Sequence, residues 1–242
     1  MDYKYPTPQL LFKAICNAIR SKTGNSDEIP HQNIPDELDS IIIDEEEYNI
    51  EMQRFIDIIE GTSFVNDRIT TVKDRLFYYC TNLTTVNIPE CTSIGNNAFN
   101  SCTRLTTIDL PECTSIGDYA FSYCTNLTTV NLPECASIGD CAFTKCTSLT
   151  TVNLPKCTSI GYSAFAGCTN LTTIILSNNQ VVTLGNINAF NNSPIVYGTG
   201  YVYVPDNLVN SYKTATNWST YASRIKPISE LPSNLKEEYG YD

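Results

Sequence analysis

The cysteines of this 242-residue chain recur at a fixed interval, and this regularity constrains the fold more than any other feature of the sequence. Nine of the 11 cysteines lie eleven residues apart along the chain. Neighbouring members are not equivalent, because four of them follow Ala-Phe-x-x and four follow Pro-Glu or Pro-Lys. The repeating unit therefore has 22 residues and two cysteines, and a period of this length is typical of a solenoid. The nine are Cys80, Cys91, Cys102, Cys113, Cys124, Cys135, Cys146, Cys157 and Cys168.

Each unit alternates apolar and polar residues before a proline and then turns back. The first unit, residues 83–104, reads LTTVNIPECTSIGNNAFNSCTR, and three further units follow without a gap. The Val-Asn-Ile part predicts a short strand with its apolar residues inward. Proline ends this strand because it has no N–H to donate to a ladder. The Ser-Ile-Gly segment then predicts a turn, and Ala-Phe-x-x-Cys predicts the return beneath the strand.

A single unit is too small to be stable alone. Its large apolar side chains contribute about 10 kcal/mol when buried, whereas ordering the whole unit costs on the order of 30 kcal/mol. Stacking on neighbouring units makes up this difference, so the array needs a cap at each end.

The chain divides into four parts on this register. Residues 1–60 predict an N-terminal helical module, because their apolar residues have helical spacing. Residues 61–82 predict a degenerate capping coil, and residues 83–195 hold the repeats, with a small insertion around Ser177–Gln180. Residues 196–242 predict a last strand and a helical cap over the open end of the core. The apolar residues of this cap are Leu208, Tyr212, Trp218, Tyr221 and Ile225.

The repeats resemble the BspA-like, or Treponema-type, leucine-rich repeat family. The shared pattern is L-x-x-V-x-L-P followed by S-I-G-x-x-A-F-x-x-C-x-x-L, and the ending YVPDNLVNSYKTATNWS is similar to the usual C-terminal cap of that family. The resemblance covers about three-quarters of the chain. It implies an α+β repeat solenoid, a right-handed leucine-rich-repeat coil with short parallel strands. It also implies a non-catalytic protein used for adhesion or protein binding.

The N-terminal stretch resembles a different group. Residues 11–41, especially AICNAIRSKTGNSDEIP and IPDELDSI, are similar to a short helical module at the start of many tail-associated proteins of phages and prophages of gut bacteria. In those proteins the module often precedes repeats of this kind. The resemblance implies that residues 1–60 anchor the chain to a particle or mediate oligomerisation.

The composition disfavours several classes of function. The net charge of −11 and the pI near 4.5 argue against nucleic acid as a partner and against docking on an anionic membrane. No apolar run is long enough to span a bilayer, and the first twenty residues lack the apolar core of a signal peptide. A single histidine, His31, leaves little room for histidine-based catalysis or metal binding, so we expect no cofactor and no metal site.

The cysteine columns have three possible interpretations: disulfides, metal ligands or buried free thiols. Zinc sites need CxxC-like pairs, which the sequence lacks. Stacked coils bring equivalent cysteines within Cα range of a disulfide but with poor Cβ geometry. Free thiols that pack as small apolar side chains are the favoured interpretation. Cys141 lies outside the series, and we expect it to be the most exposed thiol.

Two outward columns on the strands are the candidate ligand-binding residues. They offer hydroxyl and amide groups to a glycan or a partner strand, although threonine and asparagine are also ordinary occupants of an exposed sheet. The candidates are Thr85, Asn87, Thr107, Asp109, Thr129, Asn131, Thr151 and Asn153.

Two other sets of residues, a column of glutamates and the variable positions beside Ala-Phe, each have a structural and a functional interpretation. Glu90, Glu112 and Glu134 form a column followed by Lys156, which is either a solvated turn, a site for a divalent cation or a carboxylate pair of a glycosidase. The residues that flank Ala-Phe vary from unit to unit, so the return side is either unconstrained or used for recognition. These variable residues are 96–97, 118–119, 140–141 and 162–163 before Ala-Phe, and 100–101, 122–123, 144–145 and 166–167 after it.

Three hypotheses for function follow. The first is a non-enzymatic structural or binding protein of a phage or prophage particle, made in the bacterial cytoplasm, that displays the solenoid to a protein or glycan ligand. The second is a bacterial cell-surface adhesin of the BspA-like kind. The third is a solenoid carbohydrate-active enzyme.

Overall fold

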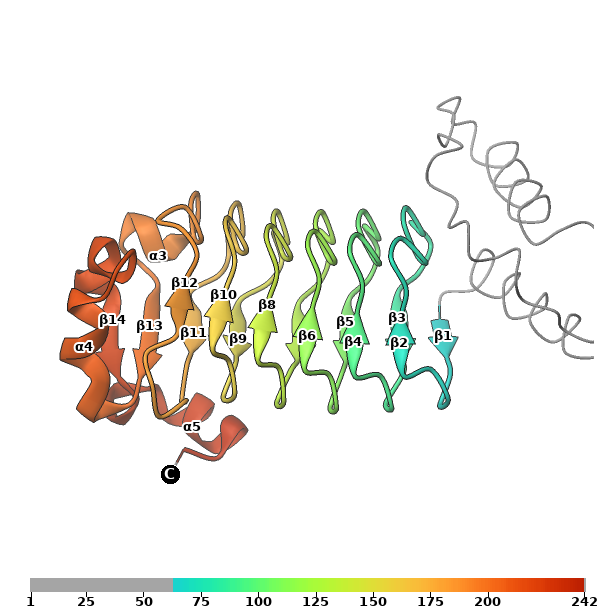
Figure 1. The fold of residues 1–242 in the computed structure, drawn as a ribbon. Coiled ribbons are helices and arrows are strands. Elements are labelled where there is room, and N and C mark those ends of the chain that lie inside the picture. Colours follow the sequence, from blue (N-terminus) through green and yellow to red (C-terminus); the bar gives the residue numbers. More distant parts are fainter. Residues whose placement is uncertain (1–62, 242) are drawn as a thin grey trace, which may run out of the picture.

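A computed structural model describes residues 63–241, which form a straight stack of coils closed at its C-terminal end by helical turns (Figure 1). Each coil of the repeat contributes two short strands. The longer strands are β1 (Ser63–Val65), β3 (Thr85–Asn87), β5 (Thr107–Asp109), β7 (Thr129–Asn131), β9 (Thr151–Asn153) and β11 (Thr173–Ile175). The shorter strands are β2 (Thr71–Val72), β4 (Ser93–Ile94), β6 (Ser115–Ile116), β8 (Ser137–Ile138), β10 (Ser159–Ile160) and β12 (Thr183–Leu184).

The strand register confirms that one repeat makes one turn of the solenoid. All pairings are parallel, and Thr85 pairs with Thr107 and then Thr107 with Thr129, so each residue meets its equivalent in the next coil. The longer strands form two sheets, β1-β3-β5-β7 and β14-β13-β11-β9, the second of which includes two strands of the C-terminal cap, β13 (Tyr201–Val204) and β14 (Ile225–Pro227). The shorter strands form one six-stranded sheet, β12-β10-β8-β6-β4-β2. The predicted repeat solenoid is therefore the observed fold.

The Ser-Ile segment is a strand rather than part of a turn, which differs from the sequence prediction. Ser115 and Ile116 pair with the same residues of the next coil, because the neighbouring backbone satisfies their hydrogen bonds. The chain turns only after the glycine that follows. A Cβ on Gly139 would lie 2.6 Å from the carbonyl carbon of Gly117 and 2.7 Å from the amide nitrogen of Asp118. Glycine is required here because the coils approach each other through their backbones.

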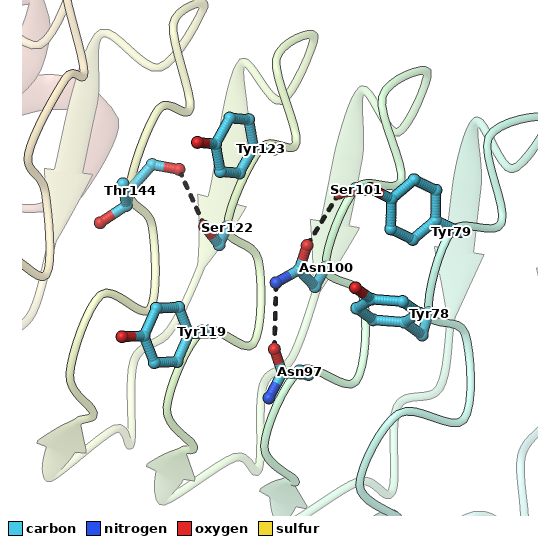
Figure 2. Close-up of a pocket in the computed structure, with 9 residues that line it drawn as sticks. All are labelled: Tyr78, Tyr79, Asn97, Asn100, Ser101, Tyr119, Ser122, Tyr123 and Thr144. Atoms are coloured by element: carbon cyan, nitrogen blue, oxygen red, sulfur yellow. Dashed lines mark hydrogen bonds between the residues drawn. The ribbon is translucent and has the colours of Figure 1, made fainter. Parts of the chain in front are cut away.

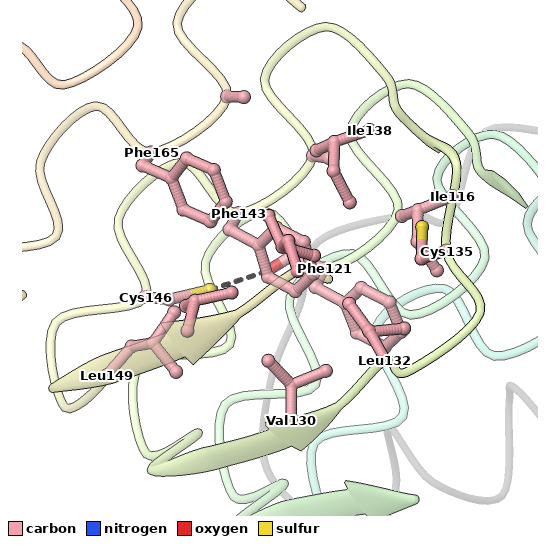
Figure 3. Close-up of a cluster of buried hydrophobic side chains, with 14 of the residues drawn as sticks. Ile116, Phe121, Val130, Leu132, Cys135, Ile138, Phe143, Cys146, Leu149 and Phe165 are labelled. Carbon is pink, nitrogen blue, oxygen red and sulfur yellow. Dashed lines mark hydrogen bonds between the residues drawn. The ribbon is translucent and has the colours of Figure 1, made fainter. Parts of the chain in front are cut away.

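The core consists of columns of equivalent side chains that run the length of the stack (Figure 3). A column of phenylalanines lies at its centre, with neighbouring ring centroids 4.9–5.8 Å apart and ring planes within 9° of parallel. Its members are Phe77, Phe99, Phe121, Phe143, Phe165 and Phe190. Each coil thus closes the core of the next, as the stability argument requires.

The column cysteines from Cys91 to Cys168 are free, buried thiols, as predicted, and Cys80 of the first coil is free and half-buried. The thiol of Cys124 donates to the carbonyl oxygen of Phe99 at 3.1 Å, and the thiol of Cys113 donates to that of Ser115 at 3.3 Å; the other coils repeat both bonds. Burial raises the pKa of Cys113 and of Cys168 to about 12. These thiols stay protonated at neutral pH and are poor nucleophiles.

The expectation that Cys141 is the most exposed thiol is wrong. Its side chain is only 8% exposed. Its backbone has a positive φ of 54°, and the thiol lies in hydrogen-bonding contact with the Tyr119 side chain of the preceding coil. Among the described residues, Cys80 of the first coil is the more exposed thiol.

The C-terminal cap combines strands with short helices. It comprises α3 (Pro194–Tyr197), β13 (Tyr201–Val204), η3 (Asp206–Leu208), α4 (Val209–Thr214), η4 (Trp218–Arg224), β14 (Ile225–Pro227), η5 (Ile228–Glu230) and α5 (Ser233–Tyr239). The buried indole of Trp218 follows Phe190 in the aromatic column at 5.9 Å and donates to the carbonyl oxygen of Val182 at 2.7 Å. Tyr212 and Tyr221 are buried beside it, as predicted, whereas Ile225 lies in a strand rather than a helix.

Residues 1–62 and 242 lie outside the described part of the chain, so the predicted N-terminal helices fall outside it. Within residues 63–241, no helix has both the length and the apolar character needed to cross a bilayer.

Candidate functional site

The predicted ligand-binding columns lie on the outer face of the longer strands. Six of the eight side chains are exposed, and the two on β9 are half-buried. The asparagine column uses part of its hydrogen-bonding capacity within the column, because Asn131 Nδ2 donates to Asp109 Oδ1 at 2.8 Å. The six exposed residues are Thr85, Asn87, Thr107, Asp109, Thr129 and Asn131. Their role as ligand contacts stays a prediction.

The C-terminal segment covers the far end of this face. Ile175, Tyr203 and Leu231 form a second small core outside the strands, and α5 packs onto it (Figure 1). The hydroxyl of Tyr241 donates to Asn153 Oδ1 at 2.8 Å. Thr151 and Asn153 therefore border a structural contact and offer less free surface than their equivalents in the preceding coils.

The glutamate column projects into solvent. Glu90, Glu112, Glu134 and Lys156 are all exposed. Among residues 63–241, no group of three or more His, Cys, Asp or Glu side chains is placed to hold a metal ion.

The return side, in contrast, carries a groove of about 570 Å³. Figure 2 shows how successive coils build it: Tyr78 and Tyr79 lie on one side, Tyr119 and Tyr123 on the other, and Asn97, Asn100 and Ser101 of the middle coil between them. Thr144 of the next coil completes the far edge. The complete lining is Tyr78, Tyr79, Asn97, Asn100, Ser101, Tyr119, Ser122, Tyr123 and Thr144. We call this set the tyrosine groove.

The groove arises because the middle coil carries smaller side chains than its neighbours. Tyr79 and Tyr123 occupy the same repeat position two coils apart, and Ser101 occupies that position between them. Two strand spacings separate the tyrosines by about 10 Å. The serine hydroxyl forms the floor, where a third tyrosine would have filled the hollow.

The groove residues adopt an unusual backbone conformation. Tyr79, Tyr119 and Tyr123 have positive φ angles of 61°, 56° and 61°. This left-handed region is unfavourable for side chains with a Cβ. Gly167, with a φ of 73°, occupies the repeat position of Tyr79 and Tyr123 two coils further on. The fold therefore accepts glycine at this position, and its backbone conformation does not require tyrosine.

Hydrogen bonds hold the floor of the groove. Asn100 Nδ2 donates to Asn97 Oδ1 at 3.0 Å, and Ser101 Oγ donates to Asn100 Oδ1 at 2.8 Å (Figure 2). Burial is the main cause that raises the pKa of Tyr78, whereas the hydrogen bond with the Cys141 thiol is the main cause that raises the pKa of Tyr119. Both phenols are neutral at physiological pH.

Sequence reasoning found part of this groove. Asn97, Asn100, Ser101, Tyr119, Ser122, Tyr123 and Thr144 all belong to the variable positions that flank Ala-Phe. Tyr78 and Tyr79 were missed because they belong to the degenerate first coil, although the repeat register aligns Tyr79 with Ser101 and Tyr123. This alignment could have identified Tyr79 as one of the variable positions.

Comparison with known proteins agrees with the fold. The structure is similar to a leucine-rich repeat protein from Bacteroides ovatus, with 27% identity and a TM-score of 0.56, over 69% of this chain and 42% of that one. It is also similar to a T. pallidum leucine-rich repeat protein (27% identity, TM-score 0.47, 63% and 82% covered). A third similar structure is a leucine-rich cell surface protein from Faecalibacterium prausnitzii (30% identity, TM-score 0.40, 56% and 42% covered).

This chain thus spans less than half the length of the Bacteroides and Faecalibacterium proteins that it matches. No match was found among curated proteins. The family model described as "BspA type Leucine rich repeat region" matches in six copies, over residues 32–135 and 92–216. With the repeat register, the columnar core and this match in agreement, the chain belongs to the BspA-type leucine-rich repeat family.

Proposed function

We propose that this chain is a non-enzymatic recognition protein of a phage or prophage particle, in which the solenoid displays a binding surface. The proposed recognition role rests on the tyrosine groove. It lies where the coils differ from one another, on a scaffold whose strand and core positions are nearly identical in every repeat. A rigid scaffold with variable surface positions is the usual arrangement of a binding protein.

The chemistry of the groove favours binding over catalysis. Its nine lining side chains are tyrosine, asparagine, serine and threonine, so no carboxylate pair lies among them. The glutamate column, which would serve a glycosidase, projects separately into solvent. BspA-type repeat families are also generally non-catalytic.

The particle half of the proposal rests on sequence alone. Residues 11–41 are similar to the N-terminal module of phage tail-associated proteins, and they lie outside the described residues. The free, buried thiols of the solenoid are compatible with assembly in the reducing bacterial cytoplasm before the particle is released.

Deletion of residues 1–60 tests this attachment. We expect the remaining chain to fold with an unchanged far-ultraviolet circular dichroism spectrum per coil, because the coils from residue 63 onward contain the described core. We also expect the truncated chain to be absent from purified particles of an induced lysogen, whereas the full chain sediments with them in a density gradient. Continued sedimentation of the truncated chain with particles would contradict the anchoring role.

The same fractionation separates the proposal from its alternative. A bacterial cell-surface adhesin would instead be found with the cell envelope of the uninduced host and would be digested by protease added to intact cells. That result would contradict the location on a phage or prophage particle, but not the proposal that the solenoid displays a recognition surface.

A further inference from the structure

We propose that the tyrosine groove binds an uncharged oligosaccharide, with sugar rings stacked on Tyr79 and Tyr123 and their hydroxyls hydrogen-bonded to the floor between them. The inference rests on the proposed recognition function and names its ligand class and its site.

The aromatic walls provide the stacking surfaces. Tyr79, Tyr119 and Tyr123 are 56%, 45% and 44% exposed, which is high for large aromatic side chains. The face of an aromatic ring is electron-rich and attracts the weakly positive C–H groups on the face of a sugar ring. Within residues 63–241 no protein group is hydrogen-bonded to the hydroxyls of Tyr79 and Tyr123, and both side chains are exposed to a ligand that enters the groove.

The polar floor supplies what a sugar hydroxyl needs. Within residues 63–241, Asn97 Oδ1 accepts from Asn100, while Asn97 Nδ2 donates to no protein group. Asn100 Oδ1 accepts from Ser101 in turn, which fixes the orientation of both amides. The floor therefore presents an oriented amide donor beside serine and threonine hydroxyls, a set that both donates to and accepts from alcohol groups.

The charge distribution selects against ionic ligands. The lining holds no Asp, Glu, Lys, Arg or His, and the nearby charges are of both signs. Arg75 lies near Tyr78, and Asp118 and Asp140 lie near Tyr119, while the ammonium group of Lys145 lies 4.9 Å from the ring centroid of Tyr123. A polyanion or a charged peptide would gain little here, because each opposite charge is matched by a like one.

The layout of the groove also disfavours a protein ligand. The core of a protein interface is usually more apolar than its rim. Here the centre is polar, formed by Asn97, Asn100 and Ser101, and the aromatic rings stand apart on either side (Figure 2). Alternating stacking and hydrogen-bonding surfaces at this spacing match a chain of sugar rings better.

The backbone conformation indicates which substitutions can remove the tyrosines without disturbing the fold. Three of the four groove tyrosines occupy left-handed positions. Gly167 shows that the fold accepts glycine at the position of Tyr79 and Tyr123. Tyr79→Gly and Tyr123→Gly should therefore preserve the fold, which gives substitutions that remove the stacking surface without disturbing the coil.

The test is calorimetric titration of the full-length protein with neutral hexasaccharides of glucose, mannose, galactose and N-acetylglucosamine, and with a sulfated hexasaccharide. We expect at least one neutral hexasaccharide to bind with micromolar to millimolar affinity and the sulfated one to bind no better. Tyr79→Gly and Tyr123→Gly should each weaken binding at least tenfold, with a melting temperature close to that of the original protein.

Two further variants make the test specific. Asn97→Asp keeps an oxygen that accepts from Asn100, replaces the outward donor with an acceptor and adds a negative charge, so it should also weaken binding at least tenfold. Tyr162→Ala is the matched control, because Tyr162 is 46% exposed and lies outside the groove, and it should leave the affinity unchanged.

Three results would overturn the inference. One is that no neutral hexasaccharide binds at millimolar concentration, and another is that binding is insensitive to the groove variants. The third is that the groove variants lose attachment to host cells while no oligosaccharide competes, which would indicate a protein ligand. This third result would leave the proposed recognition function intact. If instead the full chain failed to associate with particles, that failure would count against the proposed function and not against the binding of an oligosaccharide.

Discussion

Raising the pH from about 8 to about 10 is expected to unfold the solenoid. Eight buried thiols have pKa values raised above the ordinary 9.0, in each case mainly by burial, and burial raises the pKa of Cys113, Cys157 and Cys168 to about 12. In the unfolded chain the same thiols lose their protons near pH 9.0. Above that pH the unfolded state therefore binds fewer protons than the native state, and the free energy of unfolding falls as the pH rises.

The size of this effect follows from the number of thiols. Each thiol contributes stability that is fully present below pH 9.0 and is lost progressively up to its pKa in the fold. For the seven thiols other than Cys91, whose pKa values are raised furthest, about 1.4 kcal/mol per thiol is lost by about pH 10. These seven together lose on the order of 10 kcal/mol, which is comparable to the whole stability of an ordinary domain. Above about pH 10 the buried phenol of Tyr212, whose pKa burial raises to about 12, adds to the loss.

Urea titrations at a series of pH values, followed by circular dichroism, measure this dependence. A Cys113→Ala, Cys135→Ala double variant is the control. It should be less stable at neutral pH because it lacks two packed sulfurs, yet its stability should fall less steeply above pH 9.0, by about 1.4 kcal/mol per pH unit for each thiol removed. A free energy of unfolding that stays constant up to about pH 10.5 would contradict the burial of the thiols.

Removing one phenylalanine from the middle of the aromatic column is expected to destabilise the whole stack. Phe143 is fully buried, and its ring centroid lies 5.2 Å from that of Phe121 and 5.3 Å from that of Phe165. Phe143→Ala removes this ring from two interfaces and leaves a cavity that the rigid coils cannot close. The expected loss is about 3–5 kcal/mol, which lowers the melting temperature of a unit of this size by about 10 °C.

Thermal unfolding of two comparison variants tests whether the lost packing of the ring causes the destabilisation. Phe143→Leu retains most of the apolar volume and should lose less than half as much stability. Tyr162→Ala truncates an aromatic side chain that is 46% exposed and should shift the melting temperature by no more than about 2 °C. If Phe143→Ala melted as the original protein does, the column could not be the element that couples one coil to the next.

The winding of the chain could be predicted from the sequence because the period determines which residues are equivalent. Once one coil places Val86 and Ile88 inward, stacking places every equivalent residue inward, and Ile108 and Leu110 follow in the next coil. The same reasoning placed the thiols of Cys91 and Cys113 in the core. Periodicity is informative about burial because identical coils can share a core only in register.

Features that depend on differences between neighbouring coils could not be predicted in this way. The tyrosine groove exists because Ser101 is small between two large residues, which requires knowing that equivalent positions lie on one surface and how far each side chain extends. Cys141 is buried because Tyr119 of the preceding coil lies against it. The tail that covers Asn153 comes from outside the repeat, where the period carries no information.

The most direct test of the columnar core is the reactivity of its thiols. The native protein would be treated with N-ethylmaleimide without reductant, before and after unfolding in guanidinium, and the labelled peptides identified by mass spectrometry. We predict that the eight column thiols from Cys91 to Cys168 are protected in the native protein and that all eight react once it is unfolded. Rapid labelling of any of them in the native protein would place that position on the outside, and failure to label after unfolding would reveal a disulfide. Either result would contradict a stack in which equivalent side chains share one core.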